Sequence, residues 1–325
     1  MQFRLPAIQS TSGETRRTPR AAVIGRYNRG DDSLSLLLTA TLVAIVVTVT
    51  AAMLAALLVI CVDRERRRRY RHDPGLFRDR LRAIAPFVGV LAGILLVNKG
   101  LQTYIVAFSY RYGVEPTAVF YTLEGNAVAG IQGAFPGWST MYLSGMYVFG
   151  YAVLLTFPLV AYLFASSTRP LKTLVAAYGI NYAVAIVCYS AVRAYGPRTY
   201  HEQSESAATV NHGLVDLFPD IVYLTSLVNS QTNVFPSLHT SLSLTVLAVA
   251  VMTHAEFPRW TLLAFVFATS IVLATVVLGI HWLIDVGAGI VLAAGSVYLA
   301  RAIVTNPDRS HPAGTLERYG SSDDG

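Results

Sequence analysis

Charged residues are scarce in this sequence. Asp, Glu, Lys and Arg make up 14% of its 325 residues, whereas a soluble domain averages about 25%. Hydrophobic residues account for 54%, and the mean hydropathy is +0.49. This composition argues against an ordinary soluble enzyme. We therefore divide the chain by its long apolar segments and not by soluble domains.

Lysine and cysteine are also nearly absent. Lys99 and Lys172 are the only lysines among 25 basic residues, so arginine carries most of the positive charge behind the net charge of +6. Basic charge can indicate nucleic-acid binding, but here it borders long apolar runs. Membrane topology explains it better, and we expect no nucleic-acid partner. Cys61 and Cys188 both lie in apolar runs and provide neither a disulfide framework nor a metal cluster.

Seven apolar segments approach or exceed the roughly 20 residues that a membrane helix needs. They are Leu36–Val62, Ile84–Phe108, Trp138–Ala165, Leu171–Ala194, Ser237–Thr253, Trp260–Ile280 and Leu283–Val304. We therefore predict an all-α polytopic membrane protein. The predicted parts are a disordered basic tail (1–33), an additional transmembrane helix (34–62), an arginine-rich loop (63–83), a six-helix membrane domain (84–304) and a polar tail (305–325).

The arginine-rich segment fixes the expected orientation. Asp63–Arg82 carries nine arginines and four acidic residues. Because positively charged loops stay in the cytoplasm, we place this segment inside. Alternation then puts the long segments Ser109–Gly137 and Tyr195–Pro236 outside. The six arginines of the N-terminal tail would also lie outside, which makes the first helix the weak point of this topology.

Two histidines lie at ends of the predicted helices. His239 belongs to Asn233-Val-Phe-Pro-Ser-Leu-His, which opens the fifth span, and His281 to Leu278-Gly-Ile-His-Trp-Leu-Ile-Asp, which joins the sixth and seventh. The chain crosses the membrane and returns between them, so both are expected on the outer face of the cell membrane.

The spacing of His281 and Asp285 is typical of a catalytic pair. Residues four apart share one face of a helix. There the carboxylate can accept a hydrogen bond from one imidazole nitrogen and leave the other nitrogen free as a nucleophile. A structural His–Asp pair is the simpler alternative, but His239 on the same face favours a functional site.

Two further residues are candidates for phosphate binding. Pro236 suits the start of a helix, so the amides after it point outward at the positive end of a helix dipole, where phosphate binds readily. Ser237 can add its hydroxyl or its amide. Arg198 follows Gly-Pro after the fourth span, and arginine suits bidentate phosphate contact. Arg193 lies where arginines commonly snorkel to the membrane boundary.

Two motifs resemble those of a known family. Phe235-Pro-Ser-Leu-His-Thr-Ser and His281-Trp-Leu-Ile-Asp resemble the second and third motifs of the type 2 phosphatidic acid phosphatase superfamily. The chain is most similar to the inositolphosphotransferase branch, which includes inositol phosphorylceramide synthases, because the second motif reads Pro-Ser-x-His. The resemblance covers the last six spans. It implies a six-helix phosphatidic acid phosphatase type 2 core plus one additional N-terminal transmembrane helix.

The resemblance also implies an activity and roles for individual residues. The protein would cleave or transfer a lipid phosphate ester through a phosphohistidine intermediate. His281 would be the nucleophile, Asp285 would orient it, and His239 would protonate the leaving group and then activate the acceptor. Ser237 and Arg198 would hold phosphate oxygens. No metal and no other cofactor would be needed.

The sequence departs from the family pattern at two positions. Thr275 stands where phosphatases of the family have an arginine six residues before the motif histidine, and the inositolphosphotransferase branch also tends to lack this arginine. Ala191 stands where the first motif normally has a lysine, seven residues before its arginine, and Pro197 precedes Arg198. The second departure leaves the assignment of Arg198 open, with Arg111 as an alternative on the same face.

Other functions remain open at this stage. Water as acceptor gives a phosphatase of isoprenyl phosphates or phosphatidate, whereas inositol or a lipid hydroxyl gives a phosphotransferase, and the same histidines serve both. A transporter could use Lys99, Asn181 and Glu124, but the spans show no repeat of paired broken helices. An inactive scaffold is disfavoured by the intact motifs. The expected partners are a lipid phosphate in the bilayer and water or an alcohol, and the oligomeric state is left open.

Overall fold

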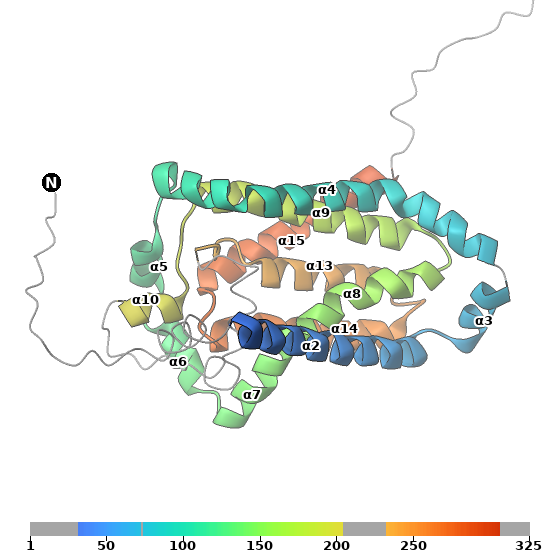
Figure 1. Cartoon of the computed structure of the whole chain (residues 1–325), viewed down its shortest axis with the longest axis horizontal. Helices are drawn as coiled ribbons and strands as arrows, with labels where there is room; N and C mark the ends of the chain where they lie inside the picture. The colour runs from blue at the N-terminus through green and yellow to red at the C-terminus, as the bar shows by residue number, and fades with distance from the viewer. Residues whose placement is uncertain (1–31, 73, 204–231, 306–325) are drawn as a thin grey trace, which may run out of the picture.

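Most of the long helices of the computed structural model lie side by side along the long axis of the molecule (Figure 1). The structure describes residues 32–72, 74–203 and 232–305. The predictions for the two tails therefore fall almost wholly outside the described residues. Within these residues the secondary structure is helical, apart from two isolated bridge pairs. The predicted all-α fold is confirmed.

Six stretches of the described chain are long and apolar enough to span a membrane, so this is a multi-pass integral membrane protein. They belong to α2 (Asp32–Cys61), α4 (Pro74–Tyr112), the run from α7 (Gly137–Gly145) through η1 (Met146–Gly150), α8 (Tyr151–Ala161) and η2 (Tyr162–Phe164), α9 (Arg169–Ala191), α14 (Pro258–Val277) and α15 (Leu283–Thr305). The seventh predicted span is the shorter apolar helix α13 (Leu238–Met252).

Helix α13 is the centre of the bundle. It packs against α9, α14, α15 and α8, while α4 lies along the outside of α9. Asn181 of α9, which is fully buried, donates a hydrogen bond of 3.2 Å to the Thr245 hydroxyl of α13. A buried amide needs such a partner, so this polar contact fixes α9 against α13 inside an otherwise apolar bundle.

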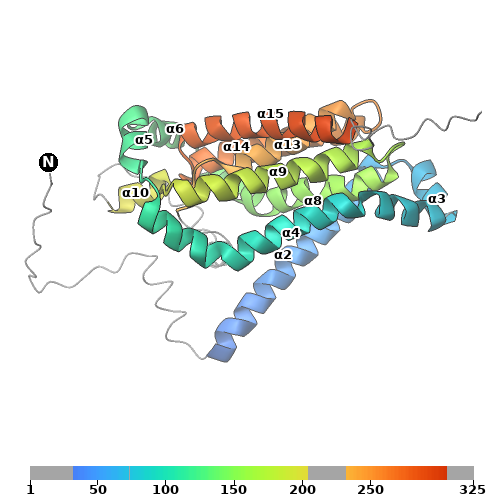
Figure 2. The ribbon, with the colours of Figure 1, turned by 90° about the horizontal axis from the view of Figure 1, so that it is seen from above.

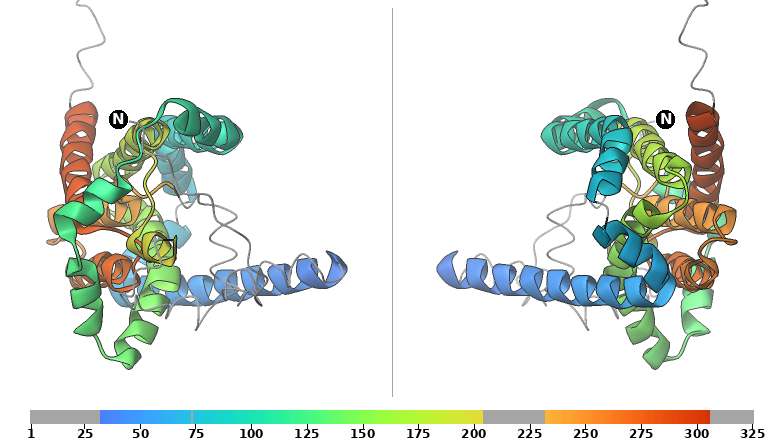
Figure 3. Two further views of the ribbon diagram at one scale, coloured as in Figure 1. Left: turned by 90° about the vertical axis from the view of Figure 1, so that its left-hand side faces the viewer. Right: turned by 90° about the vertical axis from the view of Figure 1, so that its right-hand side faces the viewer.

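Helix α2 stands apart from the six-helix core. Its C-terminal end packs on α8 and buries Leu57 and Cys61. Its N-terminal half diverges from the bundle at an angle (Figures 2 and 3), and Val47 there is 60% exposed. The additional helix is therefore attached to the core through its last turns.

The arginine-rich segment differs from the predicted loop. Residues Arg64–His72 form helix α3, and α4 begins at Pro74, ten residues before the predicted span. Arginine is a good helix former, so helical structure continues beyond the apolar sequence that marked the prediction. Arg66 pairs with the Glu256 carboxylate, and Glu256 also accepts a hydrogen bond from the Ser166 hydroxyl. These contacts tie α3 to the two connections at its end of the bundle.

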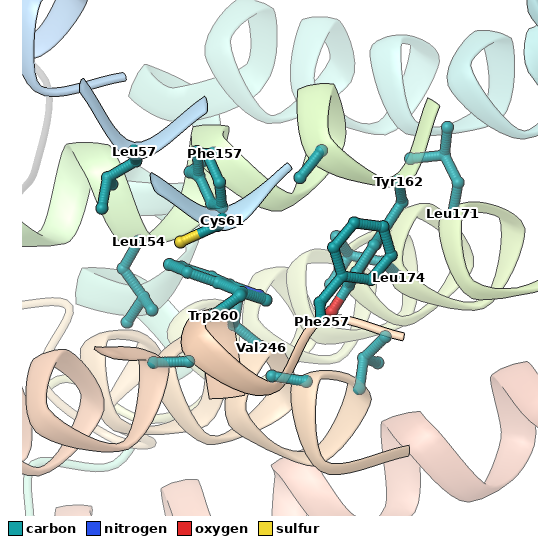
Figure 4. Close-up of a cluster of buried hydrophobic side chains, with 14 of the residues drawn as sticks. Leu57, Cys61, Leu154, Phe157, Tyr162, Leu171, Leu174, Val246, Phe257 and Trp260 are labelled. Carbon is teal, nitrogen blue, oxygen red and sulfur yellow. The ribbon is translucent and has the colours of Figure 1, made fainter. Parts of the chain in front are cut away.

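The main hydrophobic core lies between α2, α8, α9, α13 and α14 (Figure 4). The Phe157 and Trp260 rings lie 4.5 Å apart, and both side chains are fully buried. The Tyr162 hydroxyl forms a 3.0 Å hydrogen bond with that of Thr253, which satisfies a buried polar group. This core packs the five helices against one another.

Short helices cover the opposite end of the bundle. They are α5 (Thr117–Glu124), α6 (Ala127–Gly133) and α10 (Pro197–Gln203), and Figure 1 shows them across the helix ends. The two long segments predicted to lie outside the membrane supply them. Every residue of the predicted site lies at this end or next to it.

Candidate active site

The first turn of α13 meets the first turns of α15. Ser237 is the N-cap of α13, and its hydroxyl oxygen accepts the Thr240 amide at 3.2 Å, as N-cap residues commonly do. The Ser237 amide donates to the Asp285 carbonyl at 3.1 Å. Gly289 allows this approach, because a Cβ there would lie 2.7 Å from the Ser237 carbonyl oxygen. The predicted second and third motifs are thus in direct backbone contact.

This arrangement limits what Ser237 can offer a phosphate. Its amide is already engaged and its side chain is fully buried. The hydroxyl hydrogen is the one donor of Ser237 that these contacts do not use. Any phosphate contact from Ser237 must therefore come from its hydroxyl, and not from its amide as the sequence also allowed.

His281 lies in a tight turn between α14 and α15. Gly279 has φ +65°, a conformation that glycine adopts readily at the end of a helix. The amides of Ile280 and His281 then both donate to the Thr275 carbonyl, at 2.9 and 3.0 Å. Thr275 stands where phosphatases of the family described above have an arginine. Here its backbone carbonyl holds the turn that carries His281.

Asp285 is fully buried beside this turn. Its Oδ2 lies 3.5 Å from Nδ1 of His281 and accepts the Trp282 amide at 2.8 Å. The carboxylate therefore fixes the backbone after His281, and it faces Nδ1 of the imidazole at a distance longer than that of a typical hydrogen bond.

Burial lowers the pKa of His281 to about 4, with an opposing contribution from a contact with the Val234 backbone. The side chain is 3% exposed, and removal from water disfavours the charged imidazolium. A neutral imidazole at ordinary pH keeps the lone pair that a nucleophile needs.

The ring of His239 lies close to that of His281. The two centroids are 5.9 Å apart, with the planes inclined at 56°. His239 is half-buried, on the first turn of α13. Helix counting predicted that both histidines share one end of the bundle, and the structure brings their rings to a separation that one phosphate group can bridge.

The segment that carries Arg198 passes directly beside the His281 turn. The Arg198 amide donates to the Gly279 carbonyl at 3.0 Å, and the Trp282 indole donates to the Tyr195 carbonyl at 2.8 Å. A Cβ on Gly196 would lie 2.2 Å from the Ile280 carbonyl oxygen, so only glycine fits there. The Arg198 side chain is half-buried, and its charge acts on Tyr147, which stacks on His239.

The other arginines of this end are directed elsewhere. The Arg193 guanidinium lies 4.3 Å from the centroid of the Tyr110 ring, and Arg111 is exposed beside Tyr112. Of the three arginines considered from the sequence, Arg198 is the one whose backbone is bonded to the turn that carries His281.

Glu124 was not recognised as a site residue from the sequence. It ends helix α5, and its carboxylate accepts the Leu283 and Ile284 amides at 2.9 and 2.6 Å. These amides begin α15, where the helix dipole favours an anion. Glu124 therefore holds the covering helix α5 against the start of the helix that carries Asp285. The contact joins residues about 160 apart, and no local pattern signals it.

The three residues that a transporter could use, Lys99, Asn181 and Glu124, do not line a common path. Lys99 is exposed and donates to Gln102 at 3.3 Å, Asn181 pairs with Thr245 inside the bundle, and Glu124 caps α15. Within the described residues, no three His, Cys, Asp or Glu side chains are grouped so that they could hold a metal ion.

A helical membrane bundle that gathers two histidines and a buried aspartate at one end has the architecture of a membrane-embedded phosphatase or phosphotransferase. Residues 134–299, just over half of the chain, match the family model of the PAP2 superfamily, and the chain belongs to this superfamily of type 2 phosphatidic acid phosphatases. The protein is thus an enzyme of the phosphatase and phosphotransferase type. No curated protein and no solved structure is detectably similar to it.

Proposed function

We propose that this protein is a lipid phosphotransferase of the inositolphosphotransferase type, which works through a phosphohistidine intermediate. One observation carries the proposal: the His281 imidazole, with Nδ1 facing a buried carboxylate, lies 5.9 Å from a second imidazole. The buried carboxylate beside the first ring supports a role as an oriented nucleophile, and the nearness of the second ring supports a role as general acid and base.

The first half-reaction forms the phosphoenzyme. The lone pair on Nε2 of His281 attacks the phosphorus of the lipid ester, and the bond from phosphorus to the lipid oxygen breaks. His239 donates its proton to that oxygen, so a neutral lipid alcohol leaves. Asp285 holds the imidazole in position while it gains positive charge, as a triad carboxylate does.

The second half-reaction returns the enzyme to its starting state. The acceptor hydroxyl gives its proton to His239, and its oxygen attacks the phosphorus. The bond between phosphorus and His281 breaks, and the phosphate leaves as a new ester, or as inorganic phosphate when water is the acceptor. The Ser237 hydroxyl and the Arg198 guanidinium hold the phosphate oxygens during both steps.

We further propose that the site lies at the outer face of the cell membrane. The exposed arginines of α3 and of the start of α4 lie at the end of the bundle opposite His239 and His281. Because arginine-rich segments are retained in the cytoplasm, the site then faces outward. A lipid phosphate reaches it from the outer leaflet of the bilayer.

An activity screen of the purified full-length protein tests the proposed function. Phosphatidate, an isoprenyl phosphate and phosphatidylinositol are supplied in mixed micelles, with and without inositol or a lipid alcohol, and His281→Ala is the negative control. We expect release of the lipid alcohol together with transfer of the phosphate group to the added alcohol. Release of inorganic phosphate alone, unaffected by any alcohol, would identify a phosphatase instead. No turnover of any phosphate ester would contradict the proposal.

A further inference from the structure

Two tyrosine rings enclose the His239 imidazole. The Tyr147 ring stacks on it with a centroid distance of 4.6 Å and an interplanar angle of 29°. The Tyr151 ring lies at the same centroid distance, inclined at 40°. Neither family motif includes these tyrosines, and the mechanism above does not use them. We call the two rings together the tyrosine clamp.

An unusual helical turn presents these rings. Tyr147 lies in the π-helix η1, and Tyr151 is the first residue of α8, which continues it. Residues four apart project from the same side of such a helix. Single π turns inside α-helices are rare and occur frequently at functional sites. Here the turn lies opposite the one histidine of α13.

A protonated His239 would be partly withdrawn from water, which disfavours the charged form. Its neighbour His281, 5.9 Å away by ring centroid, carries no negative charge that could offset this cost. The buried Asp285 faces His281 and not His239. The faces of the tyrosine rings are the groups in contact with the imidazole that attract positive charge, because an aromatic face is electron-rich.

We infer that Tyr147 and Tyr151 are positioning residues for His239, which hold its imidazole in the plane needed for proton transfer and stabilise it while it carries the proton. The inference rests on the proposed role of His239 as general acid and base. The inference gives the tyrosine clamp contact with His239 alone, so its whole effect on turnover should pass through His239.

The test compares Tyr147→Leu, which removes the ring, with Tyr147→Phe, which keeps the ring and loses the hydroxyl. Tyr142→Leu is the matched control, because Tyr142 lies five residues earlier, is exposed, and bonds Ser270 instead of His239. Each variant is also made in the His239→Ala background. Turnover per folded enzyme is measured with phosphatidate, whose alkoxide leaving group needs a proton, and with p-nitrophenyl phosphate, which needs little.

We expect Tyr147→Leu to lower kcat for phosphatidate by about tenfold, the size of a lost aromatic stacking interaction, with little change in KM. The loss should be smaller for p-nitrophenyl phosphate and should vanish in the His239→Ala background. Tyr147→Phe and Tyr142→Leu should keep near-parental turnover. A Phe variant that is as impaired as the Leu variant would overturn the inference, and so would an equal loss with both substrates or an undiminished loss without His239.

The same experiment separates the two proposals. If His239→Ala leaves phosphatidate turnover unchanged, the proposed function fails at its general acid. If His239→Ala is impaired and the tyrosine variants behave like Tyr142→Leu, the catalytic role of His239 stands and the clamp is packing alone. Because turnover is counted per folded enzyme and compared between two substrates, a lower folded yield of Tyr147→Leu does not change the outcome.

Discussion

A single methyl group on Gly289 should separate the two histidine motifs. In Gly289→Ala the new Cβ would lie 2.7 Å from the Ser237 carbonyl oxygen and 2.9 Å from Cβ of Thr240, where ordinary contact begins at 3.4 Å. Neither neighbour is the end of a flexible side chain, so α15 must move away from α13 by about 0.7 Å along the first contact, from 2.7 to 3.4 Å. That movement carries Asp285 away from the start of α13.

The same substitution at Gly287 provides the control. Gly287 is exposed two residues earlier on α15, and a Cβ there meets nothing within 4 Å. Both substitutions gain roughly 0.5–1 kcal/mol from the lower flexibility of alanine in a helix. Only Gly289→Ala also suffers overpacking, which typically costs about 1–3 kcal/mol. The difference in stability between the two variants therefore measures the steric term alone.

Thermal unfolding in detergent and turnover of phosphatidate are the assays. We expect Gly287→Ala to match or exceed the parental stability with unchanged turnover. Gly289→Ala should be less stable than Gly287→Ala by about 1–3 kcal/mol and should lose about 10–100-fold in kcat, since a 1 Å misplacement of reacting groups can cost about 10²-fold. If Gly289→Ala kept both the stability and the turnover of Gly287→Ala, the described approach of α13 and α15 would be refuted.

Three further predictions concern the carboxylates and the orientation. Asp285→Asn should keep the fold, because its amide oxygen can still accept the backbone amide, and should lower kcat by up to about 10⁴-fold by analogy with a triad carboxylate; folded yield and kcat measured together check this. Glu124→Ala leaves two amides of α15 without their acceptor and should lower the free energy of unfolding in detergent by about 1.5–3 kcal/mol. Glu124→Gln should recover part of this loss. Equal stability of the parental protein and both variants would contradict the capping role of Glu124. Cysteines at the exposed Thr122 and Ala255 lie at opposite ends of the bundle, so in intact cells an impermeant thiol reagent should label Thr122→Cys and not Ala255→Cys; the reverse result would invert the orientation.

The sequence predicted most of the bundle because its signals are local. Apolar runs mark the seven helices. The His281–Asp285 spacing predicts a pair on one helix face; the structure places the two side chains 3.5 Å apart, but with His281 in the turn before α15 and not on the helix. Helix counting alone predicted that His239 and His281 lie at the same end. The prediction of the helices and of the shared end needs only the length of the apolar runs and the alternation of spans across the bilayer.

The features that the sequence did not reveal depend on contacts between distant segments. Glu124 reaches α15 across about 160 residues, and the stacking of Tyr147 on His239 depends on a π turn for which hydropathy gives no signal. The start of α4 was predicted ten residues too late, because the helix begins in the arginine-rich sequence that precedes the apolar run. From the sequence, either the hydroxyl or the amide of Ser237 could bind phosphate. In the folded protein the amide donates to the Asp285 carbonyl, which only the tertiary structure could show.

The central claim is that phosphate passes through His281, and trapping the intermediate tests it most directly. The full-length protein is mixed with phosphatidate labelled in its phosphate group, quenched in denaturant, and assayed for protein-bound label that is labile to acid and stable to base. We predict such a label on the parental protein, none on His281→Ala, and slow formation and slow breakdown on His239→Ala. An acid-labile phosphoenzyme that forms on His281→Ala at the parental rate would contradict the account.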